Sequence, residues 1–268
     1  MHTNHYRLLE KHTTNPADFT QENYHLHSHK FHEVYMFLEG DSKYIIEDKA
    51  YSLNSMDMFI IRKHELHQVT HNSCAPYHRI YMHIDSDFFK ENDCALYENI
   101  FLTDSKIAGN KISAKYVRSS GLYDVIMKYK KYSENYKNID LPVLKSLIIE
   151  ILHLLNQATT HSTSNYSNPV LHPIITYLNE HFTENITLDT LEEKFFVSKY
   201  YLCRIFNEAT GLTIHDYITK KRLAKAMDLK AEGYSLGDIA WKCGFGCYSS
   251  FSRAYHKEYG VSPKKKGV

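Results

Sequence analysis

The feature that most constrains the fold is a change in the spacing of apolar residues part-way along the chain. Between about residues 24 and 84, the apolar residues form short runs separated by turn residues. These runs are rich in aromatic and β-branched side chains, which favour strands. From about Lys115 onwards, apolar residues recur at steps of three and four, which is the spacing of a helix. We therefore predict an α+β protein in which the strands form an N-terminal β-barrel and precede the helices. The predicted strands are 34–38, 44–46, 51–53, 58–61, 67–69 and 78–84.

One predicted helix, residues 141–157, has a wide apolar stripe along one face. A second helix near 122–132 is predicted to pack beside it. The stripe could cover the β-barrel or form a dimer interface, and the sequence leaves both alternatives open. We assign residues 113–160 to a helical dimerisation region and expect a homodimer. The apolar positions of the stripe are Leu141, Leu144, Leu147, Ile148, Ile151, Leu152 and Leu155.

The composition indicates a two-domain protein of the cell interior. A chain of 268 residues with 43% hydrophobic residues can bury the cores of two ordinary domains. Its five cysteines are odd in number and contain no CxxC pair, which argues against a disulfide framework and a thiolate zinc site. The first residues lack a basic segment followed by an apolar run, and no long uninterrupted apolar stretch occurs. We therefore expect a cytoplasmic protein that does not insert into a membrane.

A polar and nearly uncharged stretch that begins at Ala158 separates the two predicted domains, and we assign residues 161–169 as the linker. Residues 168–268 contain 14 Lys and Arg against 11 Asp and Glu. This surplus is too small to indicate nucleic-acid binding by itself.

The last hundred residues contain two successive helix-turn-helix patterns. Thr187 and Ser198 are N-cap residues before two short apolar-periodic segments, and the residues between these segments suit a tight turn. Ser235 begins a second pair of helices, and Gly244 can adopt the left-handed conformation that ends its first helix. A long helix at about 214–230 joins the two units. The second helix of each unit could enter a major groove, and successive grooves on one face of DNA lie about 34 Å apart. Residues 170–268 are therefore predicted to be an all-α DNA-binding domain.

The motifs of this region resemble the AraC/XylS family of transcription regulators across residues 170–263. The sequence departs from the family at Glu192, where Ala is usual, and at 264–267, where an aromatic residue and an Arg are usual. The resemblance implies a sequence-specific transcription regulator, more often an activator, that binds double-stranded promoter DNA and RNA polymerase and responds to a small-molecule effector. It also implies that Arg222 braces the two units and does not contact DNA. The matching motifs are Ser198-x-x-Tyr201-Leu202-x-Arg204-x-Phe206, Gly211, Tyr217-Ile218-x-x-x-Arg222-Leu223-x-x-Ala226, Ile239-Ala240-x-x-x-Gly244-Phe245, Tyr248-x-x-Phe251-Ser252-Arg253 and Gly260-x-Ser262-Pro263.

The residues predicted to contact DNA lie on the exposed faces of the two second helices. Arg204 is the best candidate for a bidentate contact to guanine, and Arg253 is its counterpart in the second unit. Either arginine could instead clamp a phosphate or form a surface ion pair. The predicted contact residues are Lys199, Tyr200, Cys203, Arg204, Tyr248, Ser249, Ser252 and Arg253.

Residues 1–112 resemble a cupin-like effector-binding domain. In His27-x-His29-x-x-x-Glu33, the two histidines alternate onto one face of a predicted strand. Together with His67 they would suit iron, manganese, nickel or zinc, although regulators of this family generally bind organic effectors in this chamber. We therefore predict an effector site without a metal cofactor. The predicted effector-binding residues are His27, His29, Glu33, Tyr35 and His67.

Two other functions are compatible with this sequence. One is a cupin metalloenzyme with an appended DNA-binding module, in which the His and Glu residues of the chamber hold a catalytic metal. The other is a constitutive DNA-binding protein whose barrel only mediates dimerisation. The regulator is the leading prediction because its motifs extend over the whole C-terminal region, and we assign no catalytic residue.

Overall fold

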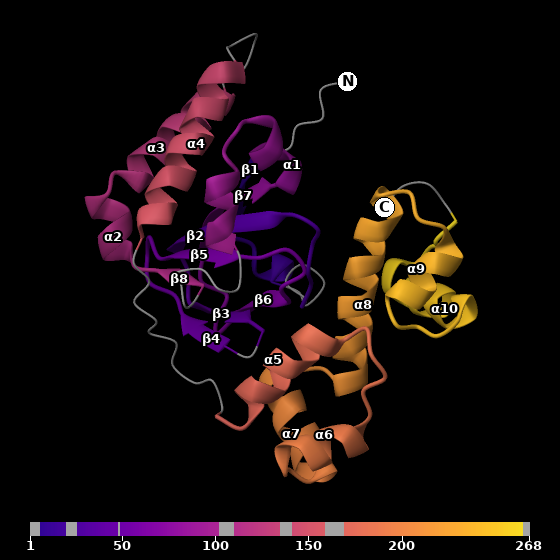
Figure 1. The fold of residues 1–268 in the computed structure, drawn as a ribbon. Helices are drawn as coiled ribbons and strands as arrows, with labels where there is room; N and C mark the ends of the chain where they lie inside the picture. Colours follow the sequence, from indigo (N-terminus) through magenta and orange to yellow (C-terminus); the bar gives the residue numbers. More distant parts are fainter. Residues whose placement is uncertain are drawn as a thin grey trace. The chain divides into compact units, whose positions relative to one another are not determined.

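A computed structural model describes residues 6–19, 26–47, 49–101, 110–134, 141–158 and 169–264. It divides into two compact units, residues 1–165 and 166–268 (Figure 1), and each is described by itself. The predicted linker 161–169 lies outside the described residues, apart from Pro169. Within the described ranges, none of the helices has the length and apolar character needed to cross a membrane.

Two antiparallel sheets form the first half of unit 1. The larger sheet has the strand order β1-β7-β2-β5-β8 and the smaller has the order β4-β3-β6. All six predicted strands are present, and the predicted α+β class is confirmed. The two sheets do not join into a closed barrel within the described residues, so the cupin-like domain is an open sandwich. The strands are β1 (Tyr6–Thr13), β2 (His32–Glu39), β3 (Ser42–Ile46), β4 (Lys49–Ser52), β5 (Met58–Ile61), β6 (His67–His71), β7 (Tyr77–Ile84) and β8 (Lys111–Ile112).

Strand β2 is buried on both faces and separates two cores. Tyr35 and Phe37 face a core between the sheets that also contains Tyr44 and Phe59. The alternate residues, among them Val34, belong to a second core on the other face of the larger sheet. This alternation places Glu33 on the same face of β2 as Tyr35, at the end of the inter-sheet core.

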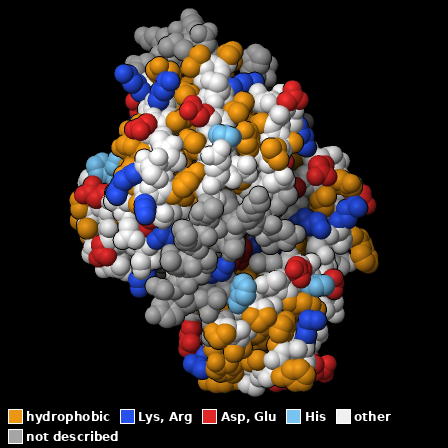
Figure 2. Space-filling view, turned by 60° about the vertical axis from the view of Figure 1, so that its left-hand side comes forward, with side chains coloured by type: hydrophobic (Ala, Val, Ile, Leu, Met, Phe, Trp, Pro, Cys, Tyr) orange, Lys and Arg blue, Asp and Glu red, His pale blue; other side chains and the backbone are white. Residues whose placement is uncertain are grey.

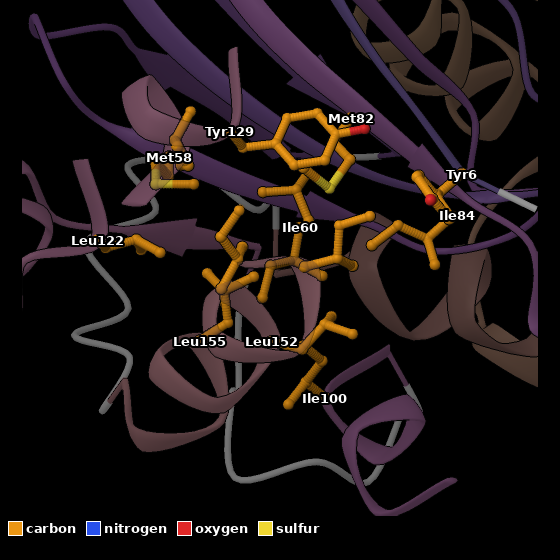
Figure 3. Packing of buried hydrophobic residues seen from close by; sticks show 14 of the residues in the cluster. Tyr6, Met58, Ile60, Met82, Ile84, Ile100, Leu122, Tyr129, Leu152 and Leu155 are labelled. Carbon is orange, nitrogen blue, oxygen red and sulfur yellow. The ribbon is translucent and has the colours of Figure 1, made fainter. Parts of the chain in front are cut away.

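Helices cover the outer face of the larger sheet. Helix α4 (Leu141–Gln157) has the predicted bounds, and α3 (Leu122–Glu134) runs two residues beyond the predicted 122–132. Figure 3 shows Leu152 and Leu155 of α4 gathered with Ile60 and Met82 of the sheet. Six of the seven stripe positions are buried in this core, so the stripe covers the sheet of its own chain. The other helices of unit 1 are α1 (Ser86–Glu91), α2 (Ala114–Ser119) and the 3-10 helices η1 (Pro16–Asp18) and η2 (Ala95–Phe101).

Unit 2 consists of helices in the predicted order. Helices α6 and α7 form the first helix-turn-helix unit, α9 and α10 form the second, and α8 runs between them (Figure 1). The side chains of Thr187, Ser198 and Ser235 each accept a hydrogen bond from a backbone N–H of the first helical turn, which confirms these three N-caps. The helices are α5 (Leu171–His181), α6 (Leu188–Phe195), α7 (Lys199–Thr210), α8 (Ile214–Ala231), α9 (Leu236–Lys242) and α10 (Tyr248–Tyr259).

The turn between α5 and α6 makes contacts that hold the two helix-turn-helix units together. Arg222 of α8 donates hydrogen bonds to the carbonyl oxygens of Phe182, at 2.7 Å, and Glu184, at 2.8 Å. Its guanidinium also lies 5.9 Å from the ring centre of Phe245 in the second unit. Gly244 ends α9 with φ +81°, and a Cβ atom there would lie 2.2 Å from the carbonyl oxygen of Thr183. Arg222 therefore contacts both helix-turn-helix units, as the resemblance implies. The second helix-turn-helix unit also packs closely against the backbone of this turn.

Candidate functional site

Helix α7 presents one face to the core and another to solvent. Ser198 begins the helix, and Leu202 and Phe206 are fully buried. The opposite face carries Tyr200, which is 82% exposed, together with the exposed Cys203 and Arg204. In Figure 2 hydrophobic side chains gather at the lower end of the molecule, where Figure 1 places α6 and α7. The exposed large hydrophobic residues of this unit include Leu188, Phe196, Tyr200 and Tyr201.

Acidic side chains neighbour both cations of α7. Lys199 Nζ forms ion pairs with Asp189 and, at 3.5 Å, with Glu192. The hydrogen bond to Asp189 raises the pKa of Lys199. Glu192, the departure from the family pattern, also accepts a hydrogen bond from the backbone N–H of Lys199 at 3.1 Å, so it stabilises the start of α7. Arg204 pairs with Glu208 at 3.1 Å across one turn of exposed helix. Such exposed pairs are weak because solvent and salt screen them, so a phosphate or a base could replace any of these three carboxylates.

Helix α10 repeats this arrangement in the second unit. Cys247 is its N-cap residue, and Phe251 and Tyr255 are buried. Tyr248, Ser249 and Arg253 are exposed, whereas Ser252 is half-buried. The Cys247 thiol lies near the hydroxyls of Ser249 and Ser250, whose hydrogen bonds lower its pKa to about 7. The Arg253 Nε donates to the carbonyl oxygen of Ser249 at 3.4 Å, a weak contact that leaves the rest of the guanidinium exposed.

The eight predicted contact residues form four equivalent pairs in the two helices. Counted from the N-caps Ser198 and Cys247, Arg204 and Arg253 are both the sixth residue. The fifth residues are Cys203 and Ser252, the second residues are Tyr200 and Ser249, and the first residues are Lys199 and Tyr248. The two helices therefore present side chains at matching positions, with the same residue in the arginine pair and different residues in the other three pairs.

In unit 1, a buried carboxylate lies at the start of β2. Glu33 is 4% exposed, and its Oε2 atom lies 3.0 Å from His29 Nε2 and 2.9 Å from His83 Nε2. Burial raises the pKa of this carboxyl, but the hydrogen bonds with the two imidazoles outweigh burial and hold the pKa well below its usual range. Burial lowers the pKa of His83.

His67 and His27 border the same group of side chains. The His67 ring centre lies 4.3 Å from that of His27 and 4.8 Å from that of His29. The Nδ1–H of His67 donates to the carbonyl oxygen of Glu65 at 2.8 Å, while its Nε2 is buried without a hydrogen-bond partner among the described residues. Burial lowers the pKa of His67 well below its usual value, so the ring is neutral. We refer to His27, His29, Glu33, His67 and His83 as the histidine chamber.

Two features of the chamber differ from the sequence prediction. His27 and His29 do not lie on a regular strand: they precede β2, and His27 makes only an isolated β-bridge with His67. His83 was not predicted as a site residue, although its strand was. It enters the chamber because β7 pairs with β2 in the register that places His83 opposite Glu33.

Tyr35, the remaining predicted effector residue, lies deeper between the sheets. It is fully buried, and its hydroxyl lies 2.8 Å from that of Tyr77. Arg79 on β7 has its guanidinium 5.6 Å from the ring centre of Tyr35 and 4.6 Å from that of Tyr81. The face of β7 that carries His83 therefore also carries the cation of Arg79 and the aromatic ring of Tyr81, next to the histidine chamber.

Comparison with known proteins agrees with this division of the chain. A family model described as an AraC-like ligand binding domain matches residues 15–92, and one described as a helix-turn-helix domain matches residues 191–266. The transcriptional activator RhaS of Shigella boydii is 27% identical over 254 residues, which cover 92% of this chain and 87% of that protein. RhaS of Citrobacter koseri is 26% identical and covers 89% of this chain and 85% of that protein. Among solved structures, ToxT of Vibrio cholerae matches 99% of this chain and 100% of that chain, with 14% identity and a TM-score of 0.40.

The two matched regions together span more than half of the chain, and they coincide with the sheets of unit 1 and the two helix-turn-helix units of unit 2. The first region contains the histidine chamber, and the second contains both exposed second helices. The chain belongs to the AraC family of transcription regulators, with an N-terminal ligand-binding domain and a C-terminal DNA-binding domain.

Proposed function

We propose that this protein activates transcription by reading two half-elements of a promoter with α7 and α10, under the control of an effector bound in unit 1. The observation that carries this proposal is the matched placement of Arg204 and Arg253, each six residues after an N-cap and exposed on the second helix of its unit. In a helix-turn-helix protein this helix lies in the major groove, where an arginine can bind guanine in a bidentate manner. Activation is proposed because the RhaS proteins, which align along most of the chain, are named transcriptional activators.

The geometry of unit 2 supports simultaneous binding by both helices. The hydrogen bonds of Arg222 and the close approach of Gly244 to Thr183 hold both helix-turn-helix units against the turn between α5 and α6. Two helix-turn-helix units held in a fixed arrangement lose less conformational freedom on binding DNA than two independent units would. The fixed arrangement therefore favours affinity for DNA. Arg204 and Arg253 would direct base recognition, while Lys199, Tyr200, Cys203, Tyr248, Ser249 and Ser252 would contact sugars, phosphates or base edges.

The effector is proposed to bind at the histidine chamber and the adjoining side chains of Tyr35 and Arg79. Binding would alter DNA recognition only if the effector binds more tightly to one arrangement of the two units than to another. We further propose that the protein acts in the cytoplasm as a homodimer that recruits RNA polymerase, and that it is not an enzyme. Because the stripe of α4 is covered by its own sheet, the proposed dimer uses surfaces other than this stripe.

Selection of genomic fragments tests this function. The purified chain and its variants Arg204→Ala and Arg253→Ala are each incubated with sheared genomic DNA, and the retained fragments are sequenced. Arg118→Ala is the matched control, because it removes an exposed arginine from unit 1. We expect the parent and the control to enrich the same few promoter sites with two half-elements about one helical turn apart, and the two unit 2 variants to lose or relax that enrichment. Weak and uniform retention by all four proteins would contradict the proposal.

A further inference from the structure

We propose that His29, Glu33, His83 and His67 bind a first-row divalent transition-metal ion where the starts of β2 and β6 meet the end of β7. This inference rests on the proposed function only in placing the ion inside the effector site, and the binding itself can be tested without DNA. The sequence alone favoured a chamber without a metal. Two structural observations now favour an ion: the approach of His83, and the hydrogen bonds that orient His29 and His67.

The possible ligand atoms of three residues are spaced as the ligands of one ion would be. One ligand atom each from His29, Glu33 and His83 can be chosen so that all three lie within 4.8 Å of one another. Glu33 Oε2 lies 3.0 Å from His29 Nε2 and 2.9 Å from His83 Nε2. Two ligands about 2.1 Å from a metal ion, at angles between octahedral and tetrahedral, lie about 3.0–3.4 Å from each other. An ion bound by these three residues therefore requires only small side-chain adjustments, whereas His67 lies outside this group and must approach it to become the fourth ligand.

Backbone carbonyl oxygens fix the position of one ring hydrogen in His29 and in His67. His29 Nδ1 lies 2.8 Å from the carbonyl oxygen of Phe31, and His67 Nδ1 lies 2.8 Å from that of Glu65. A carbonyl oxygen can only accept, so each Nδ1 carries the hydrogen, and a neutral ring then has a lone pair on Nε2. A metal-binding histidine typically has its second nitrogen fixed by a backbone carbonyl in this way.

A metal ion would bind the ring nitrogens that lie opposite these carbonyl contacts. His29 Nε2 and Glu33 Oε2 lie 3.0 Å apart, and a cation bound by both atoms would replace their mutual contact. The Nε2 of His67 is buried and has no hydrogen-bond partner among the described residues, an arrangement that costs free energy unless a ligand is bound. A metal ion bound by His29 would also give the buried Nε2 of His67 a partner once this ring moves towards it.

The donor set indicates which ions fit. Three imidazole nitrogens and one carboxylate oxygen suit Mn, Fe, Co, Ni or Zn, and do not suit Ca or Mg, which prefer oxygen ligands. The three-residue group with mutually close ligand atoms contains no cysteine, so it lacks the thiolates that favour Cu(I). Four protein ligands leave coordination positions open for an oxygen atom of an effector if the ion is five- or six-coordinate.

Calorimetric titration of the full chain with Co²⁺ and with Zn²⁺ tests this site. The protein is produced without a histidine tag and dialysed against a chelator, and the chelator is then removed. We compare the parent with Glu33→Gln and His83→Ala, and we use His78→Ala as the matched control, because His78 lies on β7 but pairs with Glu10 away from the chamber. His2 and His5 are replaced by alanine in every protein, so that they cannot contribute a second site.

We expect one ion per chain for the parent and the control, and at least tenfold weaker binding for Glu33→Gln and His83→Ala. X-ray absorption of the Co²⁺-loaded parent gives a result that does not depend on the folding of the variants, and it should show two or three imidazole ligands. Absence of stoichiometric binding, or a Co²⁺ spectrum with oxygen ligands only, would overturn the proposal. The fragment selection described above is performed without added metal, so failure of the metal site and failure of the regulator function are distinguished.

Discussion

Replacement of Gly244 by alanine should destabilise unit 2 through two separable effects. The first is backbone strain, because Gly244 has φ +81°, and an L-residue in the left-handed region costs about 1–2 kcal/mol. The second is a clash, because the new Cβ would lie 2.2 Å from the carbonyl oxygen of Thr183 and 2.7 Å from its carbonyl carbon. Relief of such a clash by backbone movement costs about 1–3 kcal/mol. We therefore expect Gly244→Ala to lower the free energy of unfolding of unit 2 by about 2–5 kcal/mol.

Two other glycines provide matched controls for this prediction. Gly246 has φ +70°, but a Cβ atom added there would have no neighbour within 4 Å, so Gly246→Ala carries the strain without the clash. Gly237 lies within α9, and its nearest neighbour to an added Cβ is Ser235 Oγ at 3.8 Å. Because alanine is a better helix former, Gly237→Ala should stabilise the unit by up to about 1 kcal/mol. The predicted order of stability is therefore Gly237→Ala, parent, Gly246→Ala and Gly244→Ala.

Urea unfolding of the full chain measures this series. Trp241 is the only tryptophan and lies in α9, so its fluorescence reports on unit 2, and far-ultraviolet circular dichroism follows both units. In a domain of this size, 1 kcal/mol corresponds to a change in Tm of about 4–8 °C. Equal free energies of unfolding for Gly244→Ala and Gly246→Ala would refute the clash and, with it, the close packing of the second unit against the turn after α5.

Substitutions at three further positions test the packing of both units and the N-cap of α7. Arg222→Met removes two hydrogen bonds to backbone carbonyls and should lower the free energy of unfolding by about 1–3 kcal/mol, while DNA affinity measured by fluorescence anisotropy falls at both half-elements. If affinity falls at one half-element only, Arg222 does not brace the pair. Ile151→Ala removes a fully buried side chain from the core beneath α4 and should cost about 2–5 kcal/mol in urea unfolding, without changing the unfolding of unit 2. A loss below about 1 kcal/mol would indicate that α4 does not pack as described. Ser198→Ala should cost about 1 kcal/mol through the lost N-cap of α7, and Ser198→Gly only a few tenths; equal losses would contradict the cap.

The features that local sequence signals determine were predictable. The 141–157 helix has its predicted bounds because seven apolar residues repeat at helical spacing along one face. The starts of α6, α7 and α9 were predicted because Thr187, Ser198 and Ser235 satisfy backbone N–H groups within the next turn. The predicted contact residues of α7 lie opposite its buried face because the apolar residues of this helix also repeat at helical spacing. Their contacts with DNA stay a prediction.

The features that depend on long-range pairing were not predictable. Strand β1 was missed because Tyr6–Thr13 mixes polar and apolar residues without clear alternation, and pairing with β7 is what holds it in the sheet. His83 was missed because the register between β2 and β7 brings it to Glu33 across 50 residues of sequence. The strand expected for His27 and His29 was wrong because backbone bonds to β6 hold His27 in a single bridge, and the chain becomes a regular strand only at His32. No local sequence pattern predicts the register between β2 and β7 or the bridge between His27 and His67.

Each helix-turn-helix unit is proposed to bind its own half-element of the promoter. The direct test measures the affinity of the parent, Arg204→Ala and Arg253→Ala for an enriched promoter site and for all of its single-base variants, with Arg118→Ala as the control. If the account is correct, Arg204→Ala removes about 1–3 kcal/mol of base discrimination within one half-element, Arg253→Ala removes a similar amount within the other, and the control removes none. A uniform loss of affinity across all sequences for both variants would show that the two arginines contact only phosphates, and would contradict the claim.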